Sequence, residues 1–272
     1  MKEPAEPLGL IAGNGRLPLQ VAREARRRGL RIVAVAHRGE TLPEIAQEAD
    51  EITWVPVGSL GRIARALREA GVRQAIMAGG LDKARLLRHF RPDVAALKVL
   101  LSARGRGDDR LLRAVAEYFA DQGIQIVDSA TLIPDLFAPT GVLSRRKPSA
   151  QEKADIEEGW RVARALGGLD VGQSVAVKSG AIVAVEAVEG TDALIRRAGA
   201  LVGPGVVIVK AAKPGQDLRF DVPTVGPKTV ETMAEAGAAA LAVEAGRTLL
   251  LDRAEMVAQA NAHRITLVGY GT

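Results

Sequence analysis

The stretch LGLIAGNGRLPLQVAREARRRG, residues 8–29, decides the fold of the amino-terminal half of the chain. It starts as a short apolar run, passes through a glycine turn, and continues with helical spacing up to a closing glycine. The same pattern predicts strands at 31–37, 51–57, 73–80 and 124–129, and helices at 59–71 and 108–123. Such alternation predicts a Rossmann-like parallel sheet with helices on both faces and ligands at the carboxyl ends of its strands.

The strand and helix rhythm breaks between residues 131 and 150, where three prolines occur. Beyond this break, the pattern predicts helices at 150–170, 191–203, 228–246 and 253–264, strands at 206–212 and 247–252, and two strands within 173–190. We therefore predict the α/β fold class with two domains. The N-terminal Rossmann-like domain covers 1–132, a short linker covers 133–144, and a C-terminal α/β domain covers 145–272.

The composition excludes several classes of protein. The 272 residues are 47% hydrophobic and 25% charged, which is typical of a folded globular protein. The absence of cysteine excludes disulfides and thiolate chemistry, and fits a reducing cytoplasm. Aromatic residues make up 3% and do not alternate with Lys or Arg, so we expect no nucleic-acid partner. No apolar stretch is long enough for a signal peptide or a membrane span, so we expect neither.

Two glycine turns follow predicted strands. The first, Gly13-Asn14-Gly15, is an incomplete dinucleotide fingerprint, because Pro18 occupies the position of the third glycine and no acidic residue directly follows the second strand. It therefore fits phosphate or nucleotide contact, or a plain tight turn, and disfavours NAD. The second turn, Gly79-Gly80, belongs to the same predicted sheet edge, where it could face the same ligand or serve only as a turn.

Polar residues mark the starts of two predicted helices. Asp108 and Asp109 follow a glycine-rich loop, and Thr191 and Asp192 follow a predicted strand. Helix capping is sufficient to explain one residue of each pair, and it does not obviously need both aspartates of the first pair. Between 85 and 113, eight basic residues alternate with apolar ones. This pattern fits contact with anionic headgroups or an acyl-bearing substrate, and equally an ordinary solvated helix face.

The segment KPGQDLRFDVPTVGP, residues 213–227, concentrates charge after the predicted strand at 206–212. Strand-like alternation would place Asp217, Arg219 and Asp221 on one face. Together with Lys210 and Lys213, these side chains would suit metal-assisted phosphoryl transfer, since carboxylates bind Mg²⁺ and Lys or Arg binds phosphate oxygens. A salt-bridged edge strand is the alternative. The three histidines lack metal-ligand spacing.

A family resemblance runs in order along nearly the whole chain. It is carried by LIAGNGRLP, MAGGLDK, GDDRLLR, LSRRKPSAQEKADIEEG, VKSGAIVAVEAVEGTDALIRRAG and VKAAKPGQDLRFDVPTVGPKTVETM. These motifs resemble those of the LpxI-type UDP-2,3-diacylglucosamine diphosphatases of lipid A biosynthesis. The resemblance implies a Mg²⁺-dependent hydrolase with its active site between two domains. Its products would be UMP and 2,3-diacylglucosamine 1-phosphate, known as lipid X.

The resemblance also implies roles for individual residues. Asp221 corresponds to the aspartate of the family's F-D-V-P motif and is expected to be catalytic and to bind the metal. Asp217 is the second choice for metal or base. The predicted substrate-binding residues are Gly13, Asn14, Gly15, Gly79, Gly80, Asp108, Asp109, Thr191, Asp192, Lys210, Lys213 and Arg219.

Partners and location follow from the same resemblance. We expect UDP-2,3-diacylglucosamine and lipid X as ligands, a cytoplasmic location, and peripheral contact with the inner membrane surface, and we leave a homodimer open. A noncatalytic nucleotide-sugar or lipid-binding protein is the main alternative. A Rossmann-type oxidoreductase is a third, less favoured one.

Overall fold

The computed structural model describes residues 6–81, 92–102, 108–220 and 222–271, without the side chains of 108–110, 131 and 132. The chain divides into two compact units. The first runs up to Ile133 and also includes the short segment Asp217–Phe220, and the second begins at Pro134. Residues 217–220 therefore pack with the first unit, although more than eighty residues separate them from Ile133 in the sequence. Phe220 contacts the hydrophobic core of that first unit.

The first unit contains a parallel sheet in the order β3-β2-β1-β4-β5. Its strands are β1 (Leu8–Ala12), β2 (Ile32–His37), β3 (Glu51–Val55), β4 (Gln74–Ala78) and β5 (Gln125–Ile126). Strand β1 has β2 on one side and β4 on the other, so the strand order reverses there. In open parallel sheets, the carboxyl ends of the strands at such a switch point are the usual place for a ligand.

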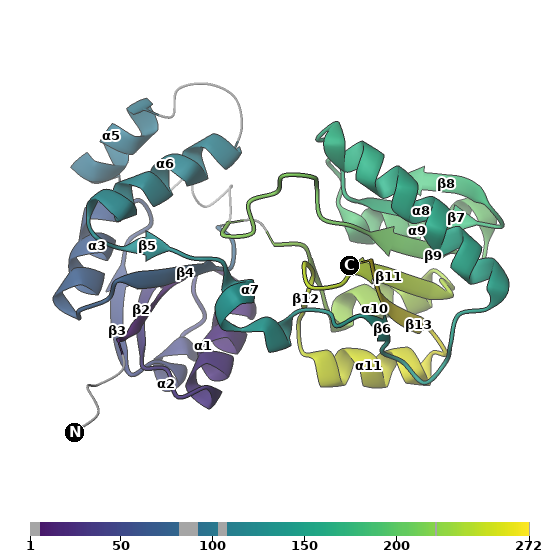
Figure 1. Cartoon of the computed structure of the whole chain (residues 1–272), viewed down its shortest axis with the longest axis horizontal. Helices are drawn as coiled ribbons and strands as arrows, with labels where there is room; N and C mark the ends of the chain where they lie inside the picture. Colours follow the sequence, from purple (N-terminus) through teal and green to yellow (C-terminus); the bar gives the residue numbers. More distant parts are fainter. Residues whose placement is uncertain (1–5, 82–91, 103–107, 221, 272) are drawn as a thin grey trace. The chain divides into compact units, whose positions relative to one another are not determined.

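Helices cover both faces of this sheet (Figure 1). They are α1 (Leu17–Arg27), α2 (Ile45–Glu48), α3 (Leu60–Glu69), α5 (Val94–Ser102), α6 (Asp108–Asp121) and α7 (Ser129–Leu132). Leu67 of α3 and Phe119 of α6 share one core with Ile11 of β1 and Val35 of β2. Helices α1 and α2 lie on the opposite face. The predicted Rossmann-like arrangement is confirmed.

The second unit contains a mixed sheet in the order β6-β13-β11-β9-β7-β8, of which β13, β11 and β9 are parallel and the other pairings antiparallel. Its strands are β6 (Gly141–Val142), β7 (Ser174–Lys178), β8 (Ala181–Val185), β9 (Val207–Lys210), β11 (Ala240–Glu244) and β13 (Thr266–Tyr270). A separate parallel pair is formed by β10 (Thr224–Val225) and β12 (Leu249–Leu250). The α/β class predicted for this half is confirmed as well.

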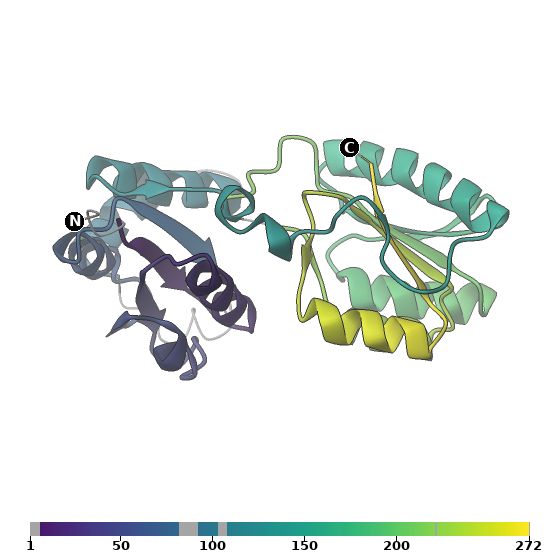
Figure 2. The same ribbon diagram turned by 60° about the horizontal axis from the view of Figure 1, so that its bottom comes forward.

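Helices cover both faces of the second sheet too (Figure 2). They are α8 (Ala150–Gly168), α9 (Thr191–Val202), α10 (Pro227–Glu235) and α11 (Arg253–Ala262). Successive strand residues point to opposite faces, so Val207 and Val209 of β9 pack with α8, whereas Ile208 joins the core under α9, α10 and α11. A strand buried on both faces must be apolar throughout, which explains the VVIV run.

The predicted helix at 228–246 is wrong in its second half. Helix α10 ends at Glu235, and Gly237 has a positive φ of 67°. The alanine-rich segment that follows is the central strand β11. Its small side chains face α8, which approaches the sheet so closely that a Cβ on Gly159 would come within 2.6 Å of Val209. Strand β13, which lies beside β11, has no counterpart in the prediction.

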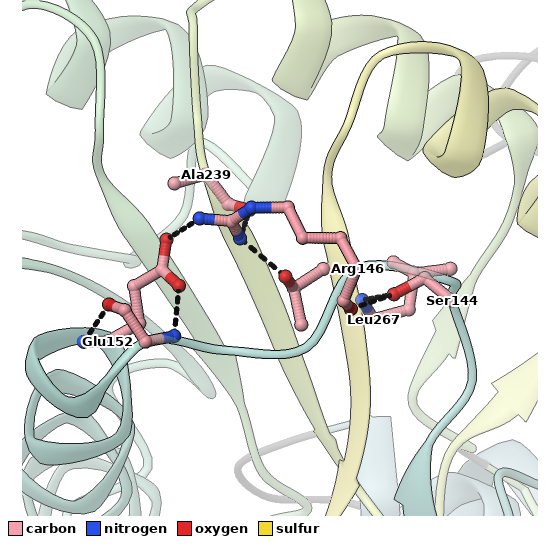
Figure 3. Close-up of polar contacts among 7 residues, drawn as sticks. Ser144, Arg146, Glu152, Ala239 and Leu267 are labelled. Atoms are coloured by element: carbon pink, nitrogen blue, oxygen red, sulfur yellow. Dashed lines mark hydrogen bonds and ion pairs between the residues drawn. The ribbon is translucent and has the colours of Figure 1, made fainter.

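The segment predicted as a linker, residues 133–144, carries structure of its own. It contains the short helix η1 (Pro134–Leu136) and β6, and β6 pairs with β13. A polar network then fixes the entry into α8 (Figure 3). Arg146 donates to Glu152, to the carbonyl of Ala239 and to Thr266, while Ser149 and Glu152 form a capping box at the helix start. The LSRRKPSAQEK motif therefore ties the start of this helix to β13 and to the residue that precedes β11.

Candidate functional site

The two glycine turns of the first unit meet at the carboxyl edge of its sheet. The amide of Gly13 donates to the carbonyl of Ala78 at 2.8 Å, and the amide of Asn14 donates to the carbonyl of Gly80 at 2.7 Å. A Cβ on Gly13 would lie 2.3 Å from the oxygen of Gly80, and one on Gly79 would lie equally close to the oxygen of Asn14. The close approach of two backbones therefore requires glycine here, which accounts for both turns without a ligand.

Asn14 connects these turns to a carboxylate. Its Oδ1 accepts from the amide of Gly80 at 3.2 Å, and its Nδ2 donates to Glu40 at 3.3 Å. The sequence spacing places Glu40 three residues beyond the end of β2, which is later than a dinucleotide fingerprint expects. The fold nevertheless brings its side chain to the glycine turn. Burial lowers the pKa of the neighbouring His37 below its usual value, although the charge of Glu40 opposes that shift.

In the second unit, Lys210 ends β9 as a buried cation with only 6% of its surface exposed. Its Nζ donates to Oγ1 of Thr191 and to the carbonyl of Thr224, both at 3.1 Å. Thr191 in turn donates to the buried carboxylate of Glu186 at 2.9 Å. The hydroxyl of Thr191 thus links a buried ammonium to a buried carboxylate, which keeps both charges hydrogen-bonded away from water.

The other charged residues predicted in this unit have different partners. Asp192, the second residue of α9, lies 4.0 Å from the ammonium of Lys228. Lys213 forms a 2.6 Å ion pair with the exposed Asp170. The structure therefore brings Thr191 and Lys210 together, and it pairs Asp192 and Lys213 with residues that the sequence did not single out.

Asp217 and Arg219 form a bidentate ion pair. Nε and Nη2 of Arg219 donate to the two carboxylate oxygens of Asp217 at 2.9 and 2.7 Å. These side-chain hydrogen bonds are the main cause that lowers the pKa of Asp217, with burial acting in the opposite direction. Asp217–Phe220 is a turn rather than the predicted alternating strand, because the amide of Phe220 donates to the carbonyl of Asp217 at 3.1 Å.

The principal catalytic prediction, Asp221, lies outside the described residues, as do the side chains of Asp108 and Asp109, whose backbone begins α6. Within the described part of the chain, no group of three or more His, Asp and Glu side chains is placed to hold a metal ion. Both oxygens of Asp217 already accept from Arg219.

Sequence reasoning missed three residues of these sites. Glu186, Ser174 and Glu40 are polar side chains that hydrogen bonds connect to predicted residues, as Ser174 is to Thr191 at 3.2 Å. The available signal for Glu186 is a charge that directly follows the apolar run AIVAV of β8. Nothing in the spacing indicates that Glu40 reaches Asn14, since 26 residues separate the two.

The first unit has a Rossmann-type strand order with glycine turns at its switch point, and the second is an α/β unit with a buried lysine at a strand end. These features define a two-domain α/β protein. Comparison with known families makes this specific. The LpxI N-terminal domain model matches residues 7–136, and the LpxI C-terminal domain model matches residues 139–268. The chain belongs to the LpxI family, which confirms the resemblance found in its sequence.

A curated relative agrees with this membership. The UDP-2,3-diacylglucosamine pyrophosphatase LpxI of Caulobacter vibrioides is 37% identical over 267 residues, covering 93% of this chain and 94% of the relative.

Likeness to solved structures is weak. A multifunctional pyruvate carboxylase from Rhizobium etli has a TM-score of 0.31 at 16% identity, covering 63% of this chain and 14% of that one. The protein gox2253 has a TM-score of 0.33 at 13% identity, covering 98% of this chain and 90% of that one. Scores this low indicate neither function nor a shared overall fold.

Proposed function

We propose that this protein hydrolyses the diphosphate bond of UDP-2,3-diacylglucosamine in lipid A biosynthesis, releasing UMP and 2,3-diacylglucosamine 1-phosphate. The observation that carries the proposal is the 37% identity to the Caulobacter vibrioides enzyme over almost the full length of both chains. The buried ammonium of Lys210 is a group suited to phosphates. The location of the reaction centre between the two domains stays a prediction from the resemblance.

The geometry of Asp217 favours Asp221 as the catalytic aspartate. A general base works best when its pKa lies near the working pH. Arg219 lowers the pKa of Asp217 and already occupies both of its oxygens. We therefore assign Asp217 the task of orienting the guanidinium of Arg219, which would stabilise charge on the phosphate oxygens. Asp221 is left as the proposed catalyst.

Lys210 is the second cation proposed to act on the phosphates. It ends strand β9, and the segment 211–220, which contains Asp217, follows directly. Hydrogen bonds to Thr191 and Thr224 hold its ammonium in one orientation, so little conformational entropy would be lost when it contacts an anion. Lys213 is partly neutralised by Asp170 and is the weaker candidate.

Dependence on Mg²⁺ is proposed from the resemblance, with Asp221 as the expected ligand. A bound Mg²⁺ would neutralise charge on the diphosphate and activate water. The decisive experiment incubates the purified protein with UDP-2,3-diacylglucosamine in Mg²⁺ or in EDTA and follows UMP and lipid X together. We expect both products in Mg²⁺, neither in EDTA, and neither from Asp221→Ala. Turnover by Asp221→Ala would contradict the assignment of this residue, and absence of products from the native protein would contradict the proposed function.

Peripheral contact with the membrane is proposed for α5. Among the described residues, none of the helices is both long and apolar enough to cross a lipid bilayer. Helix α5 buries Ala96 and Val99 but exposes Val94, Leu97 and Leu101. Exposed apolar side chains beside the cation Lys98 fit an anionic lipid surface. A cytoplasmic enzyme with a diacylated substrate would need such a contact.

Flotation with vesicles tests this contact. The native protein should float with vesicles containing phosphatidylglycerol and stay behind with neutral ones. Leu97→Ser combined with Leu101→Ser should reduce flotation several-fold. Leu201→Ser, which replaces a leucine of α9 that is more exposed than either of these two, is the control and should leave flotation unchanged. Equal flotation of all variants would contradict the assignment to α5.

A further inference from the structure

The stretch from the end of β11 to β12 holds both ends of the segment 211–223 in the second unit. At the start of the segment, the carboxylate of Glu244, the last residue of β11, accepts from the amide of Ala212 at 2.6 Å. At its end, β12 pairs in parallel with β10, and the amide of Leu249 donates to the carbonyl of Pro223 at 2.8 Å. One short stretch of chain therefore brackets the segment that carries the residues proposed for catalysis.

The side chain of Glu244 takes over where the backbone pairing of β9 with β11 ends. The amide of Ala211 donates to the carbonyl of Gln173, just before β7, at 2.9 Å. Successive amides of an extended chain point to opposite sides, so the amide of Ala212 points toward β11, where the carboxylate accepts from it. Ala212 is fully buried, and water is therefore a poor substitute for this acceptor.

Two arginines fix this carboxylate. Oε1 of Glu244 lies 3.5 Å from Nη1 of Arg164 and 3.6 Å from Nε of Arg247, whereas Oε2 accepts from the amide of Ala212. Nη1 of Arg164 also donates to the carbonyl of Ala212 at 3.5 Å. The two oxygens of Glu244 thus have separate tasks, and Ala212 is held at its amide and at its carbonyl. A hydrogen bond to a charged acceptor is about twice as strong as one between neutral groups.

The groups proposed to act on the phosphates are close to Ala212 along the chain. Lys210 precedes it by two residues, and Asp217 follows it by five. Between Ala212 and Asp217, residues 213–216 form a turn closed by a 3.0 Å backbone hydrogen bond. Nζ of Lys210 also donates to the carbonyl of Thr224 in β10, which β12 holds. A change at the bracket would therefore shift these groups, and a misplacement of about 1 Å can lower a reaction rate roughly 100-fold.

We propose that Glu244 is a positioning residue for the hydrolysis. It holds Ala212, and through this residue it orients the segment that carries Asp217 and Arg219. Only 8% of Glu244 is exposed, so it acts through the backbone and not by contact with the substrate. The effect on catalysis rests on the proposed function, whereas the hold on the segment rests on the structure alone. Glu244 and Arg164 lie outside the motifs that carry the family resemblance.

Steady-state kinetics of the full-length protein test the positioning role. Glu244→Leu removes the acceptor, so we expect kcat to fall about 100-fold while KM changes less than about threefold. Glu244→Gln keeps one oxygen for the amide of Ala212 and should recover kcat to within about tenfold of the native value. Glu231→Leu, at an exposed glutamate of α10, is the control and should match the native protein. An effect of Glu244→Leu on KM alone, or a glutamine variant as impaired as the leucine variant, would overturn the proposal.

Hydrogen exchange of the backbone amides, followed by mass spectrometry, tests the hold itself. In Glu244→Leu, peptides covering residues 211–220 should exchange about tenfold or more faster than in the native protein, because local opening becomes easier. In Glu244→Gln they should exchange at nearly the native rate. The strands β1 and β2 of the first unit should be unchanged in both variants. Native exchange of 211–220 in the leucine variant, or faster exchange along the whole chain, would overturn the local role of Glu244.

The two measurements separate this inference from the proposed function. A native protein that releases neither UMP nor lipid X, but whose variants show the expected exchange pattern, would reject the function and retain the hold on the segment. Hydrolysis with a native kcat in Glu244→Leu would do the reverse. If the leucine variant does not fold, Arg164→Gln replaces it, since this side chain is 39% exposed. We then expect kcat about fivefold lower and faster exchange of 211–220, and native values of both would overturn the proposal.

Discussion

Nζ of Lys210 at the end of β9 donates a 3.1 Å hydrogen bond to Oγ1 of Thr191, the first residue of α9. A hydroxyl has a single proton, and Thr191 gives it to Glu186 while it accepts from Lys210. The hydrogen bonds therefore run in one direction, from ammonium through hydroxyl to carboxylate. A buried charge relay of this kind is expensive to break, because each member loses a hydrogen bond that water cannot easily replace.

The first prediction concerns this relay. Thr191→Val keeps the shape of the side chain but removes the hydroxyl, so we expect the free energy of unfolding to fall by about 2–4 kcal/mol. Turnover should fall as well, because Lys210 loses its orientation. Urea unfolding and product release measure the two effects. Thr191→Ser retains the hydroxyl and should lose about 1 kcal/mol or less, and a serine variant as unstable as the valine variant would contradict the relay.

A second prediction separates the two aspartates of the DLRFD segment. Asp217→Asn keeps one carbonyl oxygen for Arg219, so we expect turnover to fall only about tenfold and its pH profile to keep its shape. Asp221→Asn should lose nearly all activity. Initial rates of UMP release between pH 5 and 9 measure both. A change in the acidic limb of the profile caused by Asp217→Asn would identify Asp217 as the base instead.

A third prediction follows from Glu152. Its burial would raise the pKa of this carboxyl, but hydrogen bonds from Arg146 and from the amide of Ser149 outweigh burial and lower it. A carboxyl whose folded pKa is lowered stabilises the protein above its unfolded pKa of about 4.3, and this stabilisation is lost as the pH falls through the folded value.

Glu152→Gln should accordingly reduce the free energy of unfolding by about 1–3 kcal/mol at pH 7. The difference from the native protein should shrink steadily below about pH 4. Chemical unfolding followed across pH 3–7 measures it. Glu157→Gln, an exposed neighbour on the same helix, is the control and should match the native protein at every pH. A loss of stability that is equal at pH 3 and pH 7 would show that the charge of Glu152 is not the cause.

The fourth prediction compares two glycines at the edge of the first sheet. A Cβ added to Gly13 would lie 2.3 Å from the backbone oxygen of Gly80, whereas one added to Gly80 would lie 3.2 Å from Oδ1 of Asn14, a side-chain atom that can move. Gly13→Ala should therefore cost about 2–3 kcal/mol of stability and Gly80→Ala less than about 1. Thermal unfolding measures both, and equal effects would contradict the close approach of the two turns.

The sequence was sufficient for the first sheet and insufficient for the centre of the second. The first unit has strong local signals, because its strands are short apolar runs bounded by glycines and its helices are amphipathic. Residues 240–244 of β11 are alanine-rich, which locally favours a helix. They form a strand because neighbouring strands β9 and β13 supply the hydrogen bonds and α8 requires small side chains there. Contacts between distant segments override propensity at such positions.

The candidate site shows the same division. Family membership was available from sequence motifs alone, since these are properties of the order of residues. The motifs also nominate Asp221, Lys210 and the glycine turns, whose roles stay predictions. The sequence predicted only that Asp217 and Arg219 point to the same face. Their ion pair arises in a turn, where two nitrogens of the guanidinium donate to one carboxylate.

By itself, the sequence determined the α/β class, the two halves and the family of this protein, because hydrophobic periodicity and motif order are local. The tertiary structure alone decided that Glu40 reaches Asn14, that Glu186 balances Lys210 through Thr191, and that Trp54 lines a pocket with Arg38. The physical reason is common to all three. Parallel strands bring residues that are distant in sequence to one edge of a sheet, and burial there favours those side chains that can satisfy one another's hydrogen bonds.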